Sequence, residues 1–248
     1  MLTTDLIIPA RNEAPNIEVL LAQLPHDRLR HVVVVDNGST DGTADLARSA
    51  GATVVHEPRP GYGGACLAGL AWIADQTPPD AVAFIDADLA DDPAQLPRLL
   101  TLLTDDDADM VIGCRPQRAE PGALTPVQRF GNQLSCTLIR LATGRRFTDL
   151  GPLRAVRYDR LQELNMADRT WGWTVEMQFK AAARGMTVAE IDVPYRCRRE
   201  GESKISGTIS GSVRAGVKIL TTIGCLWAAH LFGRLGKRRA RDGCAARS

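Results

Sequence analysis

An α/β fold built on a mostly parallel sheet is the architecture that this chain of 248 residues predicts. Short apolar runs rich in β-branched residues alternate with segments whose apolar residues recur every three or four positions, and this alternation is typical of a parallel sheet with helices on both faces. The composition, 44% hydrophobic and 24% charged, is that of an ordinary globular domain. We therefore expect one α/β domain of Rossmann-like topology, followed by a C-terminal amphipathic helix.

The first half of the chain carries the clearest strand and helix patterns. Apolar runs predict strands at Leu6–Ile8, Val32–Val35, Thr53–Val55, Ala81–Ile85 and Met110–Ile112. Helical spacing of apolar residues predicts helices at Asn16–Leu24, Thr43–Ala50, Gly64–Asp75 and Ala94–Leu103. In such a sheet, ligands bind outside the carboxyl ends of the strands, so the residues that follow each strand are candidates for a site.

After about residue 113 the pattern becomes less regular. We expect helices at Val127–Ala142 and Gly172–Ala183, a turn at Thr148–Arg154 and a strand at Thr187–Arg196. The segment Arg198–Gly207 is polar and contains glycines, which predicts a mobile loop.

The C-terminal region combines an apolar helix with a basic cluster. Val213–Gly233 is mostly apolar, but its uncharged core, Ile219–Ala229, is too short to cross a bilayer. The basic cluster that follows consists of Arg234, Lys237, Arg238, Arg239 and Arg241. This pattern fits a helix on an anionic membrane surface, and it fits equally a helix packed on the core with a basic tail. We divide the chain into a domain at 1–207 and this helix and tail at 208–248.

The net charge and the cysteines indicate which partners and which cellular compartment to expect. A net charge of +1 gives no general attraction to nucleic acid, so we expect no nucleic-acid partner. The six cysteines show no CxxC pair and are typical of reduced thiols. The chain begins without a basic and then apolar leader, so we expect a cytoplasmic protein, with attachment to the inner face of the membrane as an option.

Two acids directly after a predicted buried strand are the strongest candidate site. Asp86 and Asp88 follow Ala81–Ile85, and residues two apart at a strand end can face one cation. A loop of solvated acids that caps the next helix is the alternative. For Asp91 and Asp92, capping and a role in the site are equally good explanations.

Polar residues also follow the first two strands. Arg11 and Glu13 lie beside the end of the first strand, where a nucleotide would lie. Asp36 ends the second strand and is placed to bind ribose hydroxyls or a base edge. Gly61–Gly64 lacks the P-loop and GxGxxG patterns, and we interpret it as a turn into a helix whose N–H groups can approach a diphosphate. Trp171 and Trp173 favour core packing over sugar stacking.

Together these segments resemble the family 2 glycosyltransferases of GT-A fold. The motifs that carry the resemblance are Pro9–Glu13, Val35–Thr43, Gly61–Gly69 and Asp86–Leu89. Three later segments are similar to the dolichyl- or polyprenyl-phosphate sugar synthase branch, namely Arg129–Leu134, Thr148–Arg154 and Arg198–Lys204. The resemblance covers about residues 5–207.

The resemblance implies a set of site residues and a cofactor. A nucleotide-diphosphate sugar, UDP- or GDP-linked, would be bound by Pro9, Ala10, Arg11, Glu13, Asp36, Gly38, Asp86, Ala87 and Asp88. Asp86 and Asp88 would hold Mg²⁺ or Mn²⁺ across the diphosphate and so offset the charge of the leaving group. The acceptor or its phosphate would be bound by Arg115, Arg129, Arg154, Arg198, Ser203 and Lys204. The catalytic set would be Asp88, Arg115 and Asp149. Ala90 stands where the branch often has glutamine, and Asp91 or water would take its place.

The expected activity is an inverting transfer of a sugar to a polyprenyl phosphate by in-line displacement. A phosphate monoester is mostly dianionic at neutral pH, so it needs cationic clamps more than a general base. The first alternative is a family 2 enzyme acting on an alcohol, with Asp149 or Glu176 as base. Two others are a nucleotidyltransferase and a non-catalytic nucleotide-binding, membrane-docking module. Homo-oligomerisation is left open.

Overall fold

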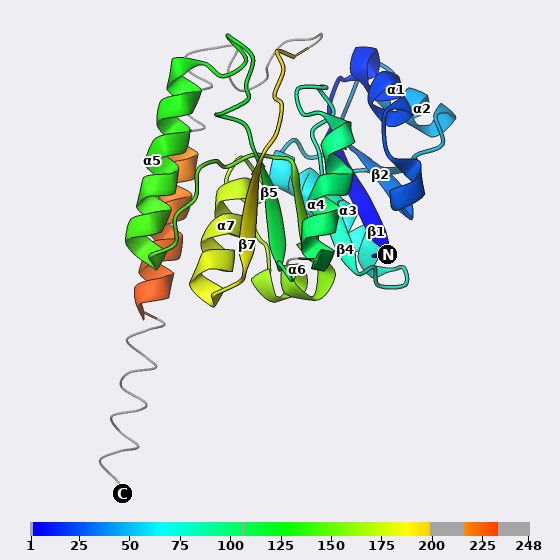
Figure 1. Ribbon diagram of the computed structural model, residues 1–248. Coiled ribbons are helices and arrows are strands. Elements are labelled where there is room, and N and C mark those ends of the chain that lie inside the picture. Colours follow the sequence, from blue (N-terminus) through cyan, green and yellow to red (C-terminus); the bar gives the residue numbers. More distant parts are fainter. Residues whose placement is uncertain (1, 106, 199–215, 233–248) are drawn as a thin grey trace, which may run out of the picture.

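One seven-stranded sheet forms the centre of the computed structural model, which describes residues 2–105, 107–198 and 216–232. The strand order is β3-β2-β1-β4-β6-β5-β7, and helices lie on both faces of the sheet (Figure 1). The strands are β1 (Thr4–Ala10), β2 (His31–Asp36), β3 (Thr53–His56), β4 (Ala81–Phe84), β5 (Met110–Cys114), β6 (Arg154–Arg157) and β7 (Val188–Asp192). The predicted α/β class with a mostly parallel sheet is confirmed.

The direction of the strands defines the functional edge. β1 pairs in parallel with β2 and β4, β2 with β3, and β5 with β7, whereas β6 runs antiparallel to both β4 and β5. All strands except β6 therefore end at the same edge. The strand order reverses at β1, which lies between β2 and β4, and such a switch point is where open α/β sheets bind ligands.

The apolar runs within β1, β2 and β4 are continuous because each of these strands contacts a core on both faces. In β1, Ile7 belongs to one core, and Leu6 and Ile8 belong to the other. Side chains of a strand alternate between faces, so a strand covered on both sides needs a continuous apolar run. Trp173 is buried in the first core with its ring edge-on to Phe84, which is the predicted packing role.

Two layers of helices complete the fold. One face is covered by α1 (Ala14–Ala22), α2 (Thr43–Ser49) and α4 (Leu96–Asp105). The other is covered by α3 (Tyr62–Ala74), α5 (Pro126–Thr143), α6 (Tyr158–Leu164), α7 (Trp173–Arg184) and the helical residues 216–232. Short 3-10 turns form η1 (His26–Arg28) and η2 (Pro93–Gln95). α5 begins with a capping box, in which Thr125 and Gln128 satisfy each other's backbone N–H groups.

The sequence prediction missed one strand and one helix. We expected Thr148–Arg154 to be a turn and predicted no element between it and the helix at Gly172–Ala183, but β6 begins at Arg154 and α6 follows directly. β6 has only Ala155 and Val156 between two arginines, so its apolar run is too short to be recognised. It forms because Ala155 and Val156 are buried between β4 and β5.

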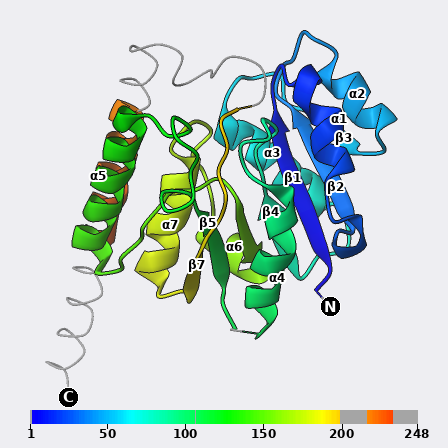
Figure 2. The same ribbon diagram turned by 45° about the horizontal axis from the view of Figure 1, so that its top comes forward.

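The C-terminal helix packs on the body of the protein. Ile223 is 1% exposed in the core beneath α5 and α7, and the Lys218 ammonium lies 2.9 Å from an oxygen of Asp168. Figures 1 and 2 show residues 216–232 beside α5 at one end of the molecule. Val217, Leu220, Leu231 and Phe232 remain exposed. The packed-helix alternative thus describes residues 216–232, and the predicted basic tail lies outside the described residues.

Candidate active site at the carboxyl edge of the sheet

The loops after β1 and β2 are locked together. The Asn12 side-chain oxygen accepts a hydrogen bond from the Thr40 N–H at 2.8 Å, and the Asn12 N–H donates to Ser39 Oγ at 3.0 Å. The Glu13 N–H donates to Thr43 Oγ1 at 2.9 Å. These bonds give the two predicted nucleotide loops one fixed geometry.

Asp36 lies beneath this junction at the end of β2. Its Oδ1 accepts the Ser39 N–H at 3.0 Å, and His56 Nδ1 lies 2.8 Å from its Oδ2. Ala10 pairs with Asp36 in the register of β1 and β2, so the ends of both strands meet here. The other predicted nucleotide residues lie around this point: Arg11 is exposed, and Pro9 and Gly38 are half-buried.

The loop after β4 carries two of the acids that define the site. Asp88 Oδ1 accepts the Ala90 N–H at 3.0 Å, and Asp88 Oδ2 lies 2.7 Å from Nη2 of Arg198. Asp86 Oδ1 is buried and has no hydrogen-bond partner among the described residues. Burial, followed by the charge of Asp88, raises the pKa of Asp86 to about 7, although a hydrogen bond from Tyr62 acts the other way. A carboxylate with one buried oxygen that lacks a partner is suited to receive a cation.

Asp91 and Asp92, which the sequence left equivalent, have different roles. Asp92 caps η2 by accepting the Ala94 N–H at 3.1 Å. Asp91 is 1% exposed, and neither of its carboxylate oxygens has a hydrogen-bond partner in the described part of the chain. Burial and the charge of Asp86 raise the pKa of Asp91 well above its usual value. Asp91 is therefore a third acid of the site, and it is fully buried.

The residues present fit a divalent cation that is shared with a ligand. Within 2–105, 107–198 and 216–232, no three His, Cys, Asp or Glu side chains form a complete metal site. Asp86 and Asp88 would supply two carboxylates, and oxygen atoms of a diphosphate and water would complete the coordination shell. Mg²⁺ and related ions are usually bound in this way, through one or two carboxylates and substrate phosphates.

Arg115 and Asp149 form a bidentate ion pair next to these acids. Arg115 Nε lies 2.7 Å from Asp149 Oδ2 and Nη2 lies 2.9 Å from Oδ1, while the Arg115 backbone N–H also donates to Oδ2. The guanidinium faces the ring of Tyr195, with 5.1 Å between its central carbon and the ring centre. Burial lowers the pKa of Arg115, but the charge and hydrogen bonds of Asp149 outweigh it and raise the pKa overall. The Arg115 guanidinium therefore stays protonated, with its charge balanced by that of Asp149.

Neither predicted general base is free to act as one. Both oxygens of Asp149 are engaged by Arg115. Glu176 lies on α7, where its carboxylate accepts the N–H groups of Ala167 and Asp168 and lies 2.7 Å from Lys180 Nζ. The prediction of Glu176 as a base is corrected, because this carboxylate holds the loop before α7.

Arg154 is also corrected. Its side chain is 1% exposed, and its guanidinium donates to the carbonyl oxygens of Leu150, Gly151 and Thr174. Burial lowers the pKa of Arg154 to about 10. With its donors directed to the main chain, Arg154 holds the turn before β6 and is not placed to bind a phosphate.

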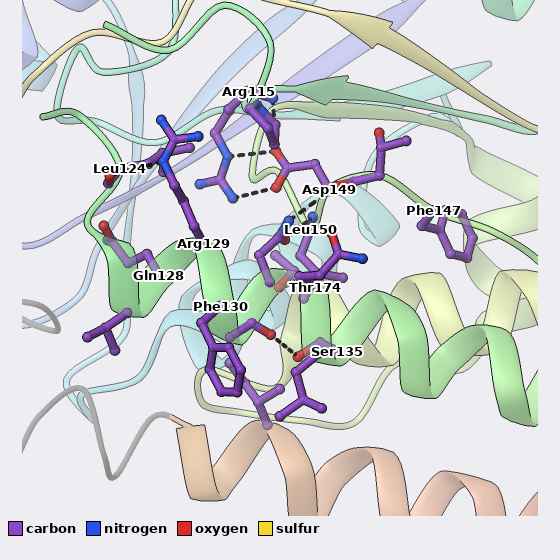
Figure 3. A pocket seen from close by; sticks show the side chains of 18 of the residues that line it. Arg115, Leu124, Gln128, Arg129, Phe130, Ser135, Phe147, Asp149, Leu150 and Thr174 are labelled. Atoms are coloured by element: carbon purple, nitrogen blue, oxygen red, sulfur yellow. Dashed lines mark hydrogen bonds and ion pairs between the residues drawn. The ribbon is translucent and has the colours of Figure 1, made fainter. Parts of the chain in front are cut away.

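A cavity of about 970 Å³ opens beside the Arg115–Asp149 pair (Figure 3). Arg115 and Arg129 lie on one side of it, and the Phe130 ring and residues of the C-terminal helix lie on the other. Its apolar walls are formed by Leu124, Val127, Phe130, Leu134, Phe147, Leu150, Ile219 and Leu220. The cavity thus has one side with Arg115 and Arg129 and another that is apolar, and the acids Asp149 and Asp192 also line it.

The glycines at the start of α3 serve internal packing. The Gly63 N–H donates to the Thr170 carbonyl at 3.1 Å, and the Gly64 N–H donates to the Arg169 carbonyl at 2.8 Å. A Cβ on Gly63 would collide with the backbone of Asp168. The suggested approach of these two N–H groups to a diphosphate is corrected, because the protein's own carbonyls occupy them.

Several residues around the site escaped the sequence analysis. Tyr62, which bonds Asp86, lies within the quoted glycine segment, and Tyr195 ends the predicted strand at Thr187–Arg196. Glu190 accepts the Thr148 N–H at 2.9 Å and so holds the loop that carries Asp149. Tyr62 begins α3 and Glu190 lies within β7, so only Tyr195, close to the end of the predicted strand, stood at a position that points to a site. The predicted Ser203 and Lys204 lie outside the described residues.

Comparisons with known proteins agree with this geometry. The family model "Glycosyl transferase family 2" matches residues 5–164. The chain is 40% identical over 211 residues to an uncharacterised glycosyltransferase of Mycobacterium tuberculosis, covering 85% of this chain and 93% of the relative. It is 34% identical over 220 residues to the undecaprenyl-phosphate mannosyltransferase of Micrococcus luteus, covering 83% and 88%.

Solved structures share the fold. Glucosyl-3-phosphoglycerate synthase from Mycobacterium tuberculosis, in complex with Mn²⁺, UDP and glucosyl-3-phosphoglycerate, aligns with a TM-score of 0.73 at 23% identity. The alignment covers 92% of this chain and 80% of that one. In the described residues, no helix combines the length and apolar character needed to cross a membrane.

Proposed function

The chain belongs to glycosyl transferase family 2, and on that basis we propose that it transfers a sugar, with inversion, from a UDP- or GDP-linked donor to a polyprenyl phosphate. One observation carries the choice of acceptor. The Arg115–Asp149 pair lines an apolar cavity, and the charge of Arg115 also lowers the pKa values of Asp86 and Asp91 after β4. The pair therefore lies between these acids and the cavity. An amphiphile with an anionic head fits a cavity of this kind.

The donor end would use the loops that follow β1, β2 and β4. Asp36 and the locked loop around Glu13 would hold the nucleoside, and Asp86 and Asp88 would hold a divalent cation. When bound, the cation stabilises the negative charge on the leaving nucleotide diphosphate. A structural neighbour that was solved with Mn²⁺ and UDP bound supports this assignment.

The acceptor end would use the side of the cavity that holds Arg115 and Arg129. Arg115 is fixed by Asp149, and Arg129 lies on the same side, so two guanidinium groups would meet a phosphate dianion there. The first isoprene units would lie against Leu124, Phe130 and Leu150. Since Asp149 and Glu176 are both engaged, a nucleophile that needs no general base is favoured over an alcohol. Relatives named as polyprenyl-phosphate transferases support the same acceptor.

Attachment to a membrane surface would bring the enzyme to such an acceptor. Val127 and Phe130 on α5 are exposed, Phe130 by 70%, and Leu220 and Phe232 are exposed on the neighbouring C-terminal helix. Monomeric soluble proteins rarely expose a large apolar patch without a function for it. We infer that this end of the molecule contacts the bilayer, with the mouth of the cavity near the lipid.

A panel of UDP- and GDP-sugars tests the proposal. Each donor is incubated with the full chain, Mn²⁺ or Mg²⁺, and either undecaprenyl phosphate or undecaprenol. We expect transfer to the phosphate alone, lost on chelation with EDTA and in Asp88→Ala. Transfer to the alcohol and not to the phosphate would replace the acceptor assignment, and nucleotide binding with no transfer to any acceptor would favour a non-catalytic module.

A further inference from the structure

Arg198 connects the two strand ends that border the switch point of the sheet. Its Nη2 lies 2.7 Å from Asp88 Oδ2, and its Nη1 lies 3.0 Å from Glu13 Oε1. Glu13 follows β1 and Asp88 follows β4, so one guanidinium bridges the nucleoside loop and the predicted cation loop. Its side chain is 27% exposed, which leaves it access to solvent and to a ligand.

The position of this guanidinium conflicts with a cation on Asp88. Asp88 Oδ1 accepts the Ala90 N–H, and Arg198 lies against Oδ2, so both carboxylate oxygens of Asp88 are engaged and one of them faces a positive charge. A guanidinium 2.7 Å from a carboxylate oxygen competes with a divalent ion for that oxygen, because two positive charges would meet at one atom. Asp86 offers its unpartnered Oδ1, but one carboxylate alone is a weak site.

We propose that Arg198 takes the place of the divalent cation in the resting protein and gives it up when a nucleotide diphosphate arrives. The diphosphate offers the guanidinium another anion and brings oxygen ligands for the metal, so donor and metal bind cooperatively. Arg198 is thus a positioning residue that acts through Asp88. This inference rests on the proposed function only in taking the donor to be a nucleotide diphosphate.

Binding of Mn²⁺ to the full chain without nucleotide, followed by electron paramagnetic resonance, tests the proposal. Arg198→Gln should bind Mn²⁺ about tenfold more tightly than the wild type, because a charged hydrogen bond to Asp88 no longer competes. Arg196→Gln is the matched control: it removes a charge from the same segment, but Arg196 faces Asp92 at 3.4 Å and not Asp88. It should leave the Mn²⁺ affinity unchanged.

Two further variants test whether the gain in Mn²⁺ affinity depends on Asp88 and on the bridging guanidinium. Asp88→Asn combined with Arg198→Gln should cancel the gain, which ties it to Asp88. Arg198→Lys, which keeps the charge but cannot bridge two carboxylates, should give an intermediate affinity and serves if Arg198→Gln is poorly folded. Addition of UDP or GDP should raise the Mn²⁺ affinity of the wild type more than that of Arg198→Gln.

The possible outcomes separate this inference from the proposed function. Equal Mn²⁺ affinity in Arg198→Gln and Arg196→Gln, or no binding by any variant at millimolar Mn²⁺, would overturn the inference even if the enzyme transfers sugar. Tighter binding by Arg198→Gln would support it even if no donor in the panel leads to transfer, which would remove the acceptor assignment instead.

Discussion

Replacing Asp149 by asparagine removes the charge that faces the buried guanidinium of Arg115. Asp149 is 1% exposed and accepts three N–H groups of Arg115, from Nε, Nη2 and the backbone. Loss of one partner of a buried ion pair costs about 3–5 kcal/mol. Asparagine keeps one acceptor oxygen, which returns about 1 kcal/mol. We therefore expect the free energy of unfolding to fall by about 2–4 kcal/mol, measured by urea denaturation.

A matched control and a double variant sharpen this measurement. Asp45→Asn breaks the Arg48–Asp45 pair, whose carboxylate is 85% exposed, and should change stability by less than about 0.5 kcal/mol. Asp149→Asn with Arg115→Met should be less destabilising than the sum of the two single changes, because no unpaired charge remains. If Asp149→Asn is as stable as Asp45→Asn, the ion pair does not hold this site.

The same variant distinguishes a clamp from a base. If Asp149 only positions Arg115, Asp149→Asn should raise the KM for the lipid phosphate by about tenfold or more and leave the KM for the donor unchanged. The dependence of kcat on pH should then keep its shape. Loss of an ascending limb in the pH profile of Asp149→Asn would refute this reasoning and restore the alcohol acceptor with Asp149 as base.

Three further predictions concern the cation site, the packing of α3 and the exposed face. The pKa of Asp86, about 7 in the fold against an ordinary 3.8, means that the folded protein binds an extra proton between these values. The stabilising effect of this protonation is therefore present below about pH 4 and is lost as the pH rises to about 7. Over that range the free energy of unfolding of the metal-free wild type should fall relative to that of Asp86→Asn. Unfolding curves of both proteins at several pH values test this, and parallel pH dependence would contradict it. Gly63→Ala should destabilise by about 1–3 kcal/mol through the clash with Asp168. Gly131→Ala, in α5 with open space around the added methyl, should stabilise the protein by about 0.5–1 kcal/mol. If Gly63→Ala and Gly131→Ala shift the melting temperature equally, the packing argument for Gly63 is wrong. Phe130→Asp should weaken co-sedimentation with phosphatidylglycerol vesicles, whereas Thr101→Asp, at an exposed position of α4, should not. Equal losses in the two variants would show that the added negative charge alone causes the effect.

The sequence was sufficient for the elements whose signal is local. β1, β2 and β4 are buried on both faces, so their apolar runs are continuous and recognisable. β6 was missed because its burial comes from its neighbours, and Arg154 was misassigned because an arginine near a loop gives no sign that main-chain carbonyls will surround it. Asp91 and Asp92 look alike in sequence, and only the packing of the loop after β4 separates the buried acid from the helix cap.

In the candidate site, too, only the features with a local sequence signal could be predicted. Acids after strands could be found, since the carboxyl ends of parallel strands meet at one edge. Their partners could not, because the pairs join distant parts of the chain: Arg115 with Asp149, 34 residues apart, and Glu13 with Arg198, 185 residues apart. Charge patterns alone do not choose among the many arginines available to each acid.

The contacts of Asp168 have a consequence for how this chain can be divided. Its carboxylate lies 2.9 Å from Lys218 and accepts from Thr222 in the C-terminal helix, while the backbone of the same loop packs on the start of α3, where Tyr62 bonds Asp86. A truncated version ending near residue 207 would uncover the core around Ile223 and remove the support of this loop. Ending the chain near residue 207 would therefore disturb the cation site indirectly, through the Asp168 loop and the start of α3. Shortened forms should keep the helix through residue 232.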